Sequence, residues 1–108
     1  MTVEGLLDHG FQKVALPDGQ REIDGVYIGD LLSWVMGRCR MDNAWITIMS
    51  NNNVIAVASL SDASCVILAE GVELAPELVE LAESKYINVL KSPLSAYEIA
   101  VKLSTLLS

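Results

Sequence analysis

The sequence has few of the side chains on which catalytic and metal sites are built. Its 108 residues include one histidine, His9, and two cysteines, Cys39 and Cys65. A lone histidine excludes metal sites built on paired histidines and weakens any serine or cysteine triad. The two cysteines lack metal-ligand spacing, so we expect reduced structural thiols. No metal and no cofactor are therefore predicted.

The nucleotide and nucleophile motifs of common enzymes are also missing. There is no Gly-x-x-x-x-Gly-Lys-Ser/Thr phosphate loop and no Gly-x-Gly-x-x-Gly after a predicted strand. A Gly-x-Ser-x-Gly nucleophile elbow is absent as well. We therefore predict a protein that is not an enzyme.

Positive charge is scarce, and no long apolar run occurs. The seven basic residues are scattered, and the net charge is −7. Only Arg38 and Arg40 approach the basic stripe that nucleic-acid binding requires, so we expect no nucleic-acid partner. Acidic residues interrupt the apolar segments before they reach membrane-span length, and the first ten residues do not resemble a signal peptide. We expect a cytoplasmic chain with no membrane partner.

Apolar residues, in contrast, are abundant. They make up 52% of the chain against 19% charged residues, which is rich for a small soluble protein. Such an excess indicates a sheet covered on both faces, or an apolar surface buried in an oligomer.

Extended and helical patterns alternate along the chain. Turn residues, caps and hydrophobic periodicity set the boundaries of each element. We predict strands over 11–16, 23–28, 45–49, 64–69 and 87–90, and helices over 2–7, 30–37, 54–60, from 76, and 95–107. This order favours βαβ units, and hence one α/β domain over residues 1–108, in three layers with a mostly parallel sheet flanked by helices.

Two helix starts are specific enough to test. Val54 to Ala58 could form a strand or a buried helix, but asparagine is a preferred cap and no hairpin glycine is present. We predict a helix capped by Asn53. Ser95 and Glu98 match a capping box at the start of the last helix.

Two acidic residues and one cysteine are the remaining candidates for a catalytic group, and the sequence supports none of them strongly. Asp24 and Asp30 could pair for acid–base work, but capping of the helix after Gly29 already explains Asp30. Cys39, between Arg38 and Arg40, is the one thiol whose pKa neighbouring charge could lower.

Three polar strand-to-helix junctions remain as a candidate ligand site. Ligands of parallel sheets bind beyond the carboxyl ends of the strands, where helix N-termini direct N–H groups outward. The candidate ligand-binding residues are Gly29, Asp30, Ser50, Asn51, Asn53, Lys91, Ser92 and Ser95. A small anion or a nucleotide phosphate would suit them. The favoured alternative is that they are only helix caps.

Several segments in fixed order resemble those of stand-alone DRTGG-domain proteins over roughly residues 20–107. They are VYIGDLLSWVM (26–36), AWIT (44–47), NVIAVA (53–58) and KSPLSAYE (91–98). The naming pentapeptide corresponds to 22–26 and keeps one glycine, and Asn51 stands where members often carry a histidine. The resemblance implies a fold related to the N-terminal domain of HPr kinase/phosphorylase.

The resemblance further implies regulation rather than catalysis. DRTGG domains occur beside nucleotide-sensing CBS domains in some inorganic pyrophosphatases, and often dimerise. Stand-alone forms tend to lie near genes for iron-only hydrogenases and signalling kinases. Two hypotheses follow: a dimeric regulatory module that binds an unidentified protein partner, or a ligand sensor that binds a nucleotide or anion at the junctions.

Overall fold

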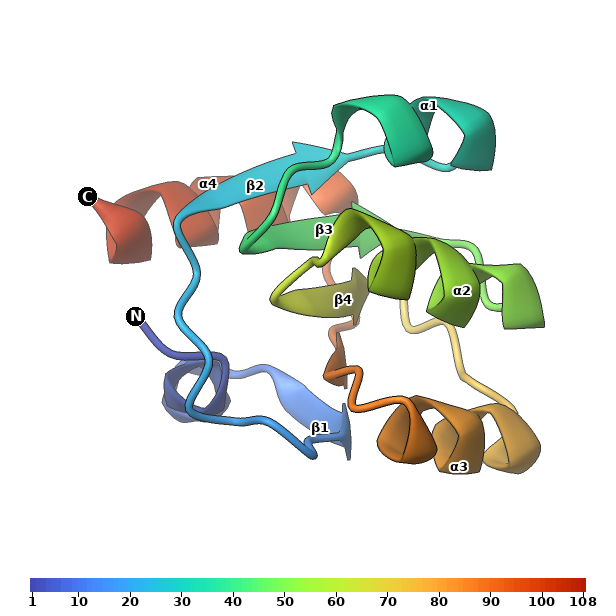
Figure 1. Ribbon diagram of the computed structural model, residues 1–108. Coiled ribbons are helices and arrows are strands. Elements are labelled where there is room, and N and C mark those ends of the chain that lie inside the picture. Colours follow the sequence, from blue (N-terminus) through green and yellow to red (C-terminus); the bar gives the residue numbers. More distant parts are fainter.

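The computed structural model describes residues 1–108, whose five strands form one sheet in the order β1-β5-β4-β3-β2 (Figure 1). The strands are β1 Gln12–Ala15, β2 Gly25–Ile28, β3 Asn43–Thr47, β4 Cys65–Leu68 and β5 Val89–Lys91. β2 to β5 pair in parallel, and β1 pairs antiparallel with β5. The predicted mostly parallel α/β sheet is confirmed.

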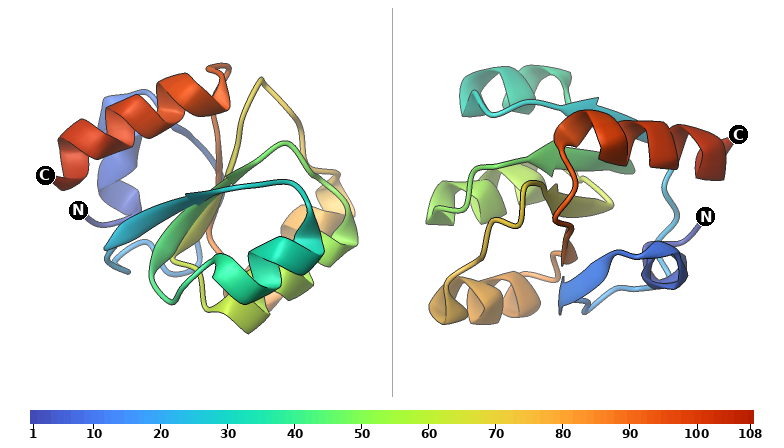
Figure 2. Two further views of the ribbon diagram at one scale, coloured as in Figure 1. Left: turned by 90° about the horizontal axis from the view of Figure 1, so that it is seen from above. Right: turned by 180° about the vertical axis from the view of Figure 1, so that it is seen from behind.

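Helices cover both faces of the sheet, so that the domain has three layers (Figure 2). The helices are η1 Glu4–His9, α1 Leu32–Arg38, α2 Asn52–Ser61, α3 Pro76–Ser84 and α4 Ala96–Leu107. α1, α2 and α3 pack on one face with Trp45 and Val66, whereas η1 and α4 pack on the other with Ile46 and Ile67. Alternate strand residues therefore belong to two separate hydrophobic cores, and filling both accounts for much of the excess of apolar residues.

The helix at α2 is confirmed, but its predicted cap is wrong. Asn51 is the N-cap residue, and its side chain accepts a hydrogen bond from the backbone N–H of Asn53 at 3.0 Å. Asn53 lies inside the first turn, and its backbone N–H is one of the donors without an intrahelical acceptor that the cap satisfies. The helix begins earlier than the apolar run because Asn52 and Asn53 form its exposed first turn.

α1 also differs from its prediction. It begins at Leu32 rather than near Asp30, and Leu31 is its N-cap residue. The helical spacing of Leu31, Leu32, Val35 and Met36 predicts that all four share one face toward the core. Val35 is buried and Leu32 half-buried, but Leu31 is 60% and Met36 54% exposed. A helix this short offers the core only one narrow stripe, which leaves apolar side chains on the surface.

The N-terminal segment forms a 3₁₀ helix rather than an α-helix. Gly10 ends it at φ 90°, in the left-handed region that favours glycine. None of the helices is both long and apolar enough to cross a membrane.

Candidate functional site

The three candidate junctions follow β2, β3 and β5 at the carboxyl edge of the sheet, but they do not form one cluster. β2 and β3 are neighbours, so Gly29–Asp30 and Ser50–Asn53 lie near each other. β4 separates β3 from β5, which places the junction after Lys91 about 10 Å further along the sheet at the usual strand spacing.

The junction after β2 is tied to the end of β3. One carboxylate oxygen of Asp30 accepts hydrogen bonds from Thr47 Oγ1 at 2.7 Å and from the backbone N–H of Ile48 at 3.0 Å. The Gly29 carbonyl accepts one from Trp45 Nε1 at 2.8 Å. The predicted capping role of Asp30 is wrong, since no side chain caps α1; its carboxylate joins two strand ends instead.

The junction after β5 uses its polar groups internally. Lys91 forms an ion pair with Glu73 at 2.6 Å, and buried Ser92 accepts a hydrogen bond from the Leu94 N–H at 3.1 Å. Ser95 Oγ accepts from the Glu98 N–H at 3.2 Å, and the Glu98 carboxylate accepts from the Ser95 N–H at 3.1 Å, which confirms the capping box. These bonds lower the pKa of Glu98, because they favour its charged form.

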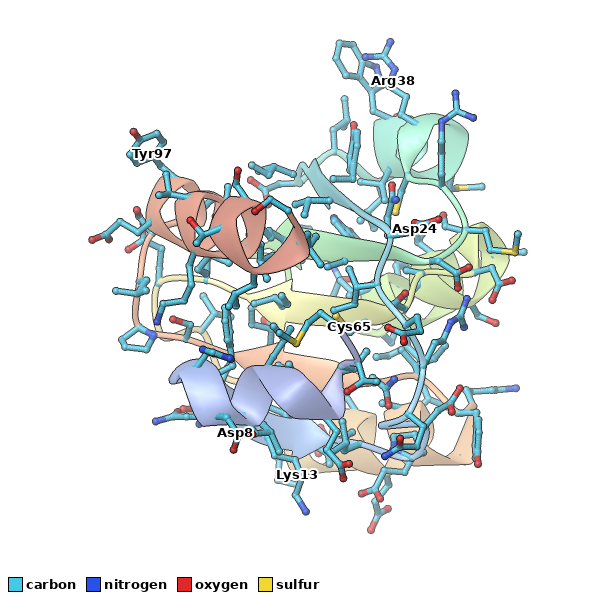
Figure 3. All side chains as sticks on the ribbon, turned by 90° about the vertical axis from the view of Figure 1, so that its left-hand side faces the viewer. Asp8, Lys13, Asp24, Arg38, Cys65 and Tyr97 are labelled. Carbon is cyan, nitrogen blue, oxygen red and sulfur yellow. The ribbon has the colours of Figure 1, made fainter.

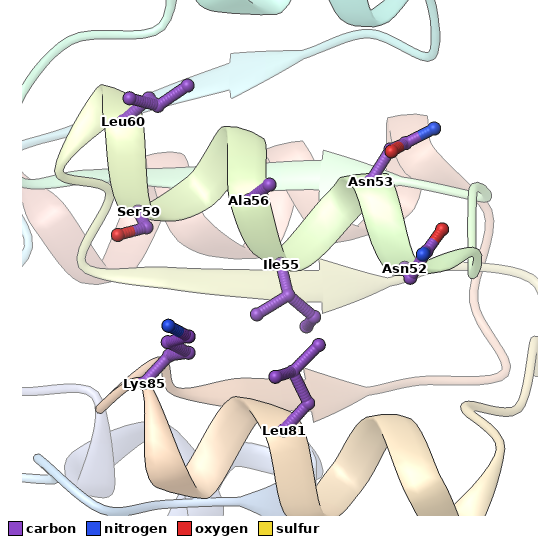
Figure 4. A pocket seen from close by; sticks show the side chains of 8 residues that line it. All are labelled: Asn52, Asn53, Ile55, Ala56, Ser59, Leu60, Leu81 and Lys85. Carbon is purple, nitrogen blue, oxygen red and sulfur yellow. The ribbon is translucent and has the colours of Figure 1, made fainter.

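The structure has one pocket, a groove between α2 and α3 with a cavity volume of about 480 Å³ (Figure 4). We call it the α2–α3 groove. It is lined by Asn52, Asn53, Ile55, Ala56, Ser59, Leu60, Leu81 and Lys85. Of the candidate site residues, only Asn53 lines it.

Sequence reasoning missed the other groove residues, although a signal for them exists. The five α2 residues follow the spacing of one helix face, i, i+3, i+4, i+7 and i+8 from Asn52. This face lies beside the stripe that packs on the sheet. Only the position of α3 makes it one wall of a groove, and Leu81 and Lys85 form the other.

Neither thiol is activated. Cys39 and Cys65 are buried, and burial raises the pKa of Cys39 and raises that of Cys65 to about 12. Neighbouring arginines therefore do not lower the pKa of Cys39, as they could have done, and the thiol is structural, as expected. The Arg38 guanidinium lies over the Trp34 ring instead, 3.7 Å from its centroid.

No three His, Cys, Asp or Glu side chains gather as metal ligands could. Arg21 joins two acidic residues across the amino ends of the strands, at 3.0 Å from Asp42 and 2.8 Å from Asp62. Both aspartates have positive φ, which aspartate tolerates better than most residues. This cluster holds the segment before β2 against the two turns that precede β3 and β4.

Exposed apolar side chains flank β2, which forms one edge of the sheet. We call the following set the β2-edge surface: Ile28, Leu31, Trp34, Tyr97 and Val101. Trp34 is 53% and Tyr97 77% exposed. In the view from above, β2 lies uncovered between α1 and α4 (Figure 2), and Tyr97 and Arg38 project on that side of the molecule (Figure 3).

The fold and these sites define a class: a three-layer α/β domain with polar helix junctions, one groove and an apolar sheet edge. The model of the DRTGG domain matches residues 18–106, and the chain belongs to this family. No curated protein matches the chain.

A solved structure shares the fold. It is the crystal structure of the CBS and DRTGG domains of the regulatory region of Clostridium perfringens pyrophosphatase, in complex with its activator, diadenosine tetraphosphate. The TM-score is 0.69 at 16% sequence identity, and the match covers 93% of this chain. It covers 44% of the other chain, so this chain spans less than half of that regulatory region.

Proposed function

We propose that this chain is a non-catalytic regulatory module that acts by association, and that it forms a homodimer through the β2-edge surface. The observation that carries the proposal is the set of exposed apolar side chains on β2 and on the two helices beside it, which includes Leu31, Trp34 and Tyr97. Large apolar side chains gathered on one side of a protein surface are typical of protein interaction sites. The match to a regulatory region supports the regulatory part.

The edge of β2 offers backbone groups as well as side chains. β2 is hydrogen-bonded to β3 on one side only, so alternate N–H and C=O groups on its other side lack a strand partner. Two copies related by a twofold axis can pair their β2 strands antiparallel and continue the sheet. In such a dimer, each copy would cover Leu31, Trp34 and Tyr97 of the other copy, on the two faces of the new strand pair.

The energy balance favours a reversible dimer. Half-exposed side chains of this size gain about 1–1.5 kcal/mol each on full burial. Six of them, three from each copy, gain roughly 6–9 kcal/mol, near the lower part of the estimated 4–15 kcal/mol cost of association. Strand pairing must supply the remainder, so we expect a dimer that dissociates on dilution.

Light scattering coupled to size-exclusion chromatography tests the dimer. We expect a dimer at tens of micromolar, and we expect Trp34→Glu and Tyr97→Glu to give monomers, because each buries a charge in the interface. Leu60→Glu is the matched control, since Leu60 is 73% exposed on α2, outside the β2-edge surface. A wild-type protein that is strictly monomeric at this concentration would refute the proposal.

Ligand sensing at the junctions is the second candidate. It rests on the fold shared with a regulatory region whose activator is a nucleotide. The proposed contacts for a nucleotide or anion remain Gly29, Asp30, Ser50, Asn51, Asn53, Lys91, Ser92 and Ser95. Binding requires that some of their internal hydrogen bonds be exchanged for bonds to the ligand.

Thermal shift with adenine nucleotides tests this candidate. A ligand that binds the folded state raises the melting temperature, and a hundredfold excess over Kd stabilises by about 2.7 kcal/mol. An unchanged melting temperature with millimolar nucleotide would leave these residues with structural roles only. A cytoplasmic location and a functional link to hydrogenases or signalling kinases stay predictions. The gene neighbourhood and a pull-down from the native host would test them.

A further inference from the structure

Tyr86, directly after α3, adopts a backbone conformation that suits its side chain poorly. Its φ is 63°, in the left-handed region, where residues with a bulky side chain are strained. The other non-glycine residues with positive φ are the acidic Asp42, Asp62 and Glu70. Tyr86 is the aromatic exception.

The hydrogen bonds around Tyr86 are those of a Schellman motif. The Tyr86 N–H donates to the Glu83 carbonyl at 3.2 Å, and the Ile87 N–H donates to the Ala82 carbonyl at 2.8 Å. In this motif the residue after the C-cap is left-handed and is most often glycine. Asp62 ends α2 in the same conformation, but its carboxylate binds Arg21.

The hydrogen bonds of this motif involve only the backbone, and the tyrosine side chain adds none. Its side chain is 62% exposed, and no hydrogen bond involves its hydroxyl group. A strained residue whose own side chain contributes no hydrogen bond to the fold is a candidate for a functional role. The residue before it, Lys85, lines the α2–α3 groove and forms no ion pair.

The groove has an order that suits one kind of ligand (Figure 4). Ile55 and Leu81 face each other in its middle, and the ammonium group of Lys85 lies at one end. The carboxamides of Asn52 and Asn53 lie at the opposite end. Lys85 is the only charged lining residue, in a chain whose net charge of −7 otherwise repels anions.

We propose that the α2–α3 groove binds a small amphipathic anion, with its flat apolar body over Ile55 and Leu81, its anionic head at Lys85, and Tyr86 covering that end. The volume of about 480 Å³ falls in the range of small-molecule sites. A sulfonate, carboxylate or phosphate head would suit Lys85 equally. This site is separate from the β2-edge surface and does not depend on the dimer.

Two probes with an aromatic body and an anionic head test the site: anilinonaphthalene sulfonate by fluorescence, and adenosine monophosphate by calorimetry. We expect at least one to bind the wild-type protein with a Kd below about 1 mM. Binding of the sulfonate alone would assign an apolar carboxylate-like ligand, and binding of the phosphate would assign a nucleotide. Failure of both probes to bind would overturn the proposal.

Two variants separate binding from folding. Lys85→Gln should raise the Kd of the probe about fivefold or more. Lys13→Gln, which removes an exposed lysine on β1, should leave the Kd unchanged. Tyr86→Gly should raise the Kd of the probe to a similar extent. It should also raise the melting temperature by a few degrees, because glycine relieves the strain of the left-handed conformation.

A lower melting temperature with unchanged probe binding would assign Tyr86 to packing and contradict the proposal. If light scattering shows that the Tyr86→Gly variant is a monomer, then Tyr86 acts in dimerisation, and this result would also contradict the proposal.

Discussion

Asn51, Asn52 and Asn53 have the same side chain but different roles, decided by their positions at the start of α2. Asn51 has an extended backbone, φ −88° and ψ 173°, and its Oδ1 accepts the N–H of Asn53. Asn52 and Asn53 lie in the first turn and line one end of the groove. Only Asn51 satisfies an otherwise unpaired donor of the helix.

Replacement of these asparagines should therefore have unequal effects. Asn51→Ala should lower the free energy of unfolding by about 1 kcal/mol through loss of the cap. Asn53→Ala should change it by no more than about 0.5 kcal/mol, since alanine is a good helix former. Urea denaturation measures both, and a larger loss for Asn53→Ala would contradict the observed cap.

At the scale of the element, α4 has the most complete local stabilisation. The capping box closes its first turn, Ile99 and Leu103 are buried against the sheet, and the Lys102 ammonium donates to the His9 carbonyl at 2.8 Å. α1 is the opposite case, a seven-residue helix with no side-chain cap. Its position depends on packing against α2 and the sheet.

The capping box should give α4 a pH dependence. Hydrogen bonds from Ser95 lower the pKa of Glu98 in the folded state, so their contribution is complete above the unfolded pKa and is lost as pH falls through the folded pKa. Ser95→Ala keeps the backbone N–H, which is the larger cause, and removes the smaller contribution of the side chain, so the Glu98 pKa should rise only part of the way toward its usual range. Carbon NMR titration of the Glu98 carboxyl measures this.

Ser104→Ala is the control for that titration, because Ser104 is an exposed serine of the same helix outside the capping box. It should leave the Glu98 pKa unchanged. An equal shift in both variants would show that the box does not set this pKa.

At the scale of the whole molecule, charge opposes the proposed dimer. Each copy carries a net charge of −7, from 14 acidic and 7 basic residues. Two such copies repel each other over a distance set by the Debye length, which shrinks from about 30 Å at 0.01 M salt to about 8 Å at physiological ionic strength. Apolar burial at the β2-edge surface must exceed that repulsion.

Salt should therefore tighten the dimer. We expect the dissociation constant to fall severalfold between about 0.01 M and about 0.15 M sodium chloride, as measured by sedimentation velocity over a dilution series. Dissociation by salt would indicate ion pairs across the interface, and would be inconsistent with an apolar one.

Local signals predicted most of the fold, but less of the arrangement of its sites. Alternating helical and extended segments indicated the parallel sheet, and Ser95 with Glu98 indicated the start of α4. The antiparallel pairing of β1 with β5 joins segments more than seventy residues apart, beyond the reach of any local pattern. The exposure of Leu31 and Met36 depends on where α1 begins and was predicted wrongly.

The sequence by itself determined the class of this protein: its alternation of elements, its capping box, its two covered sheet faces and its membership of the DRTGG family. The tertiary structure decided which polar groups meet. It placed β4 between β3 and β5, tied Asp30 to Thr47, and brought Lys85 beside the outer face of α2. Caps and periodicity act within a turn or two of chain, whereas strand order and helix contacts arise when distant apolar faces pack together.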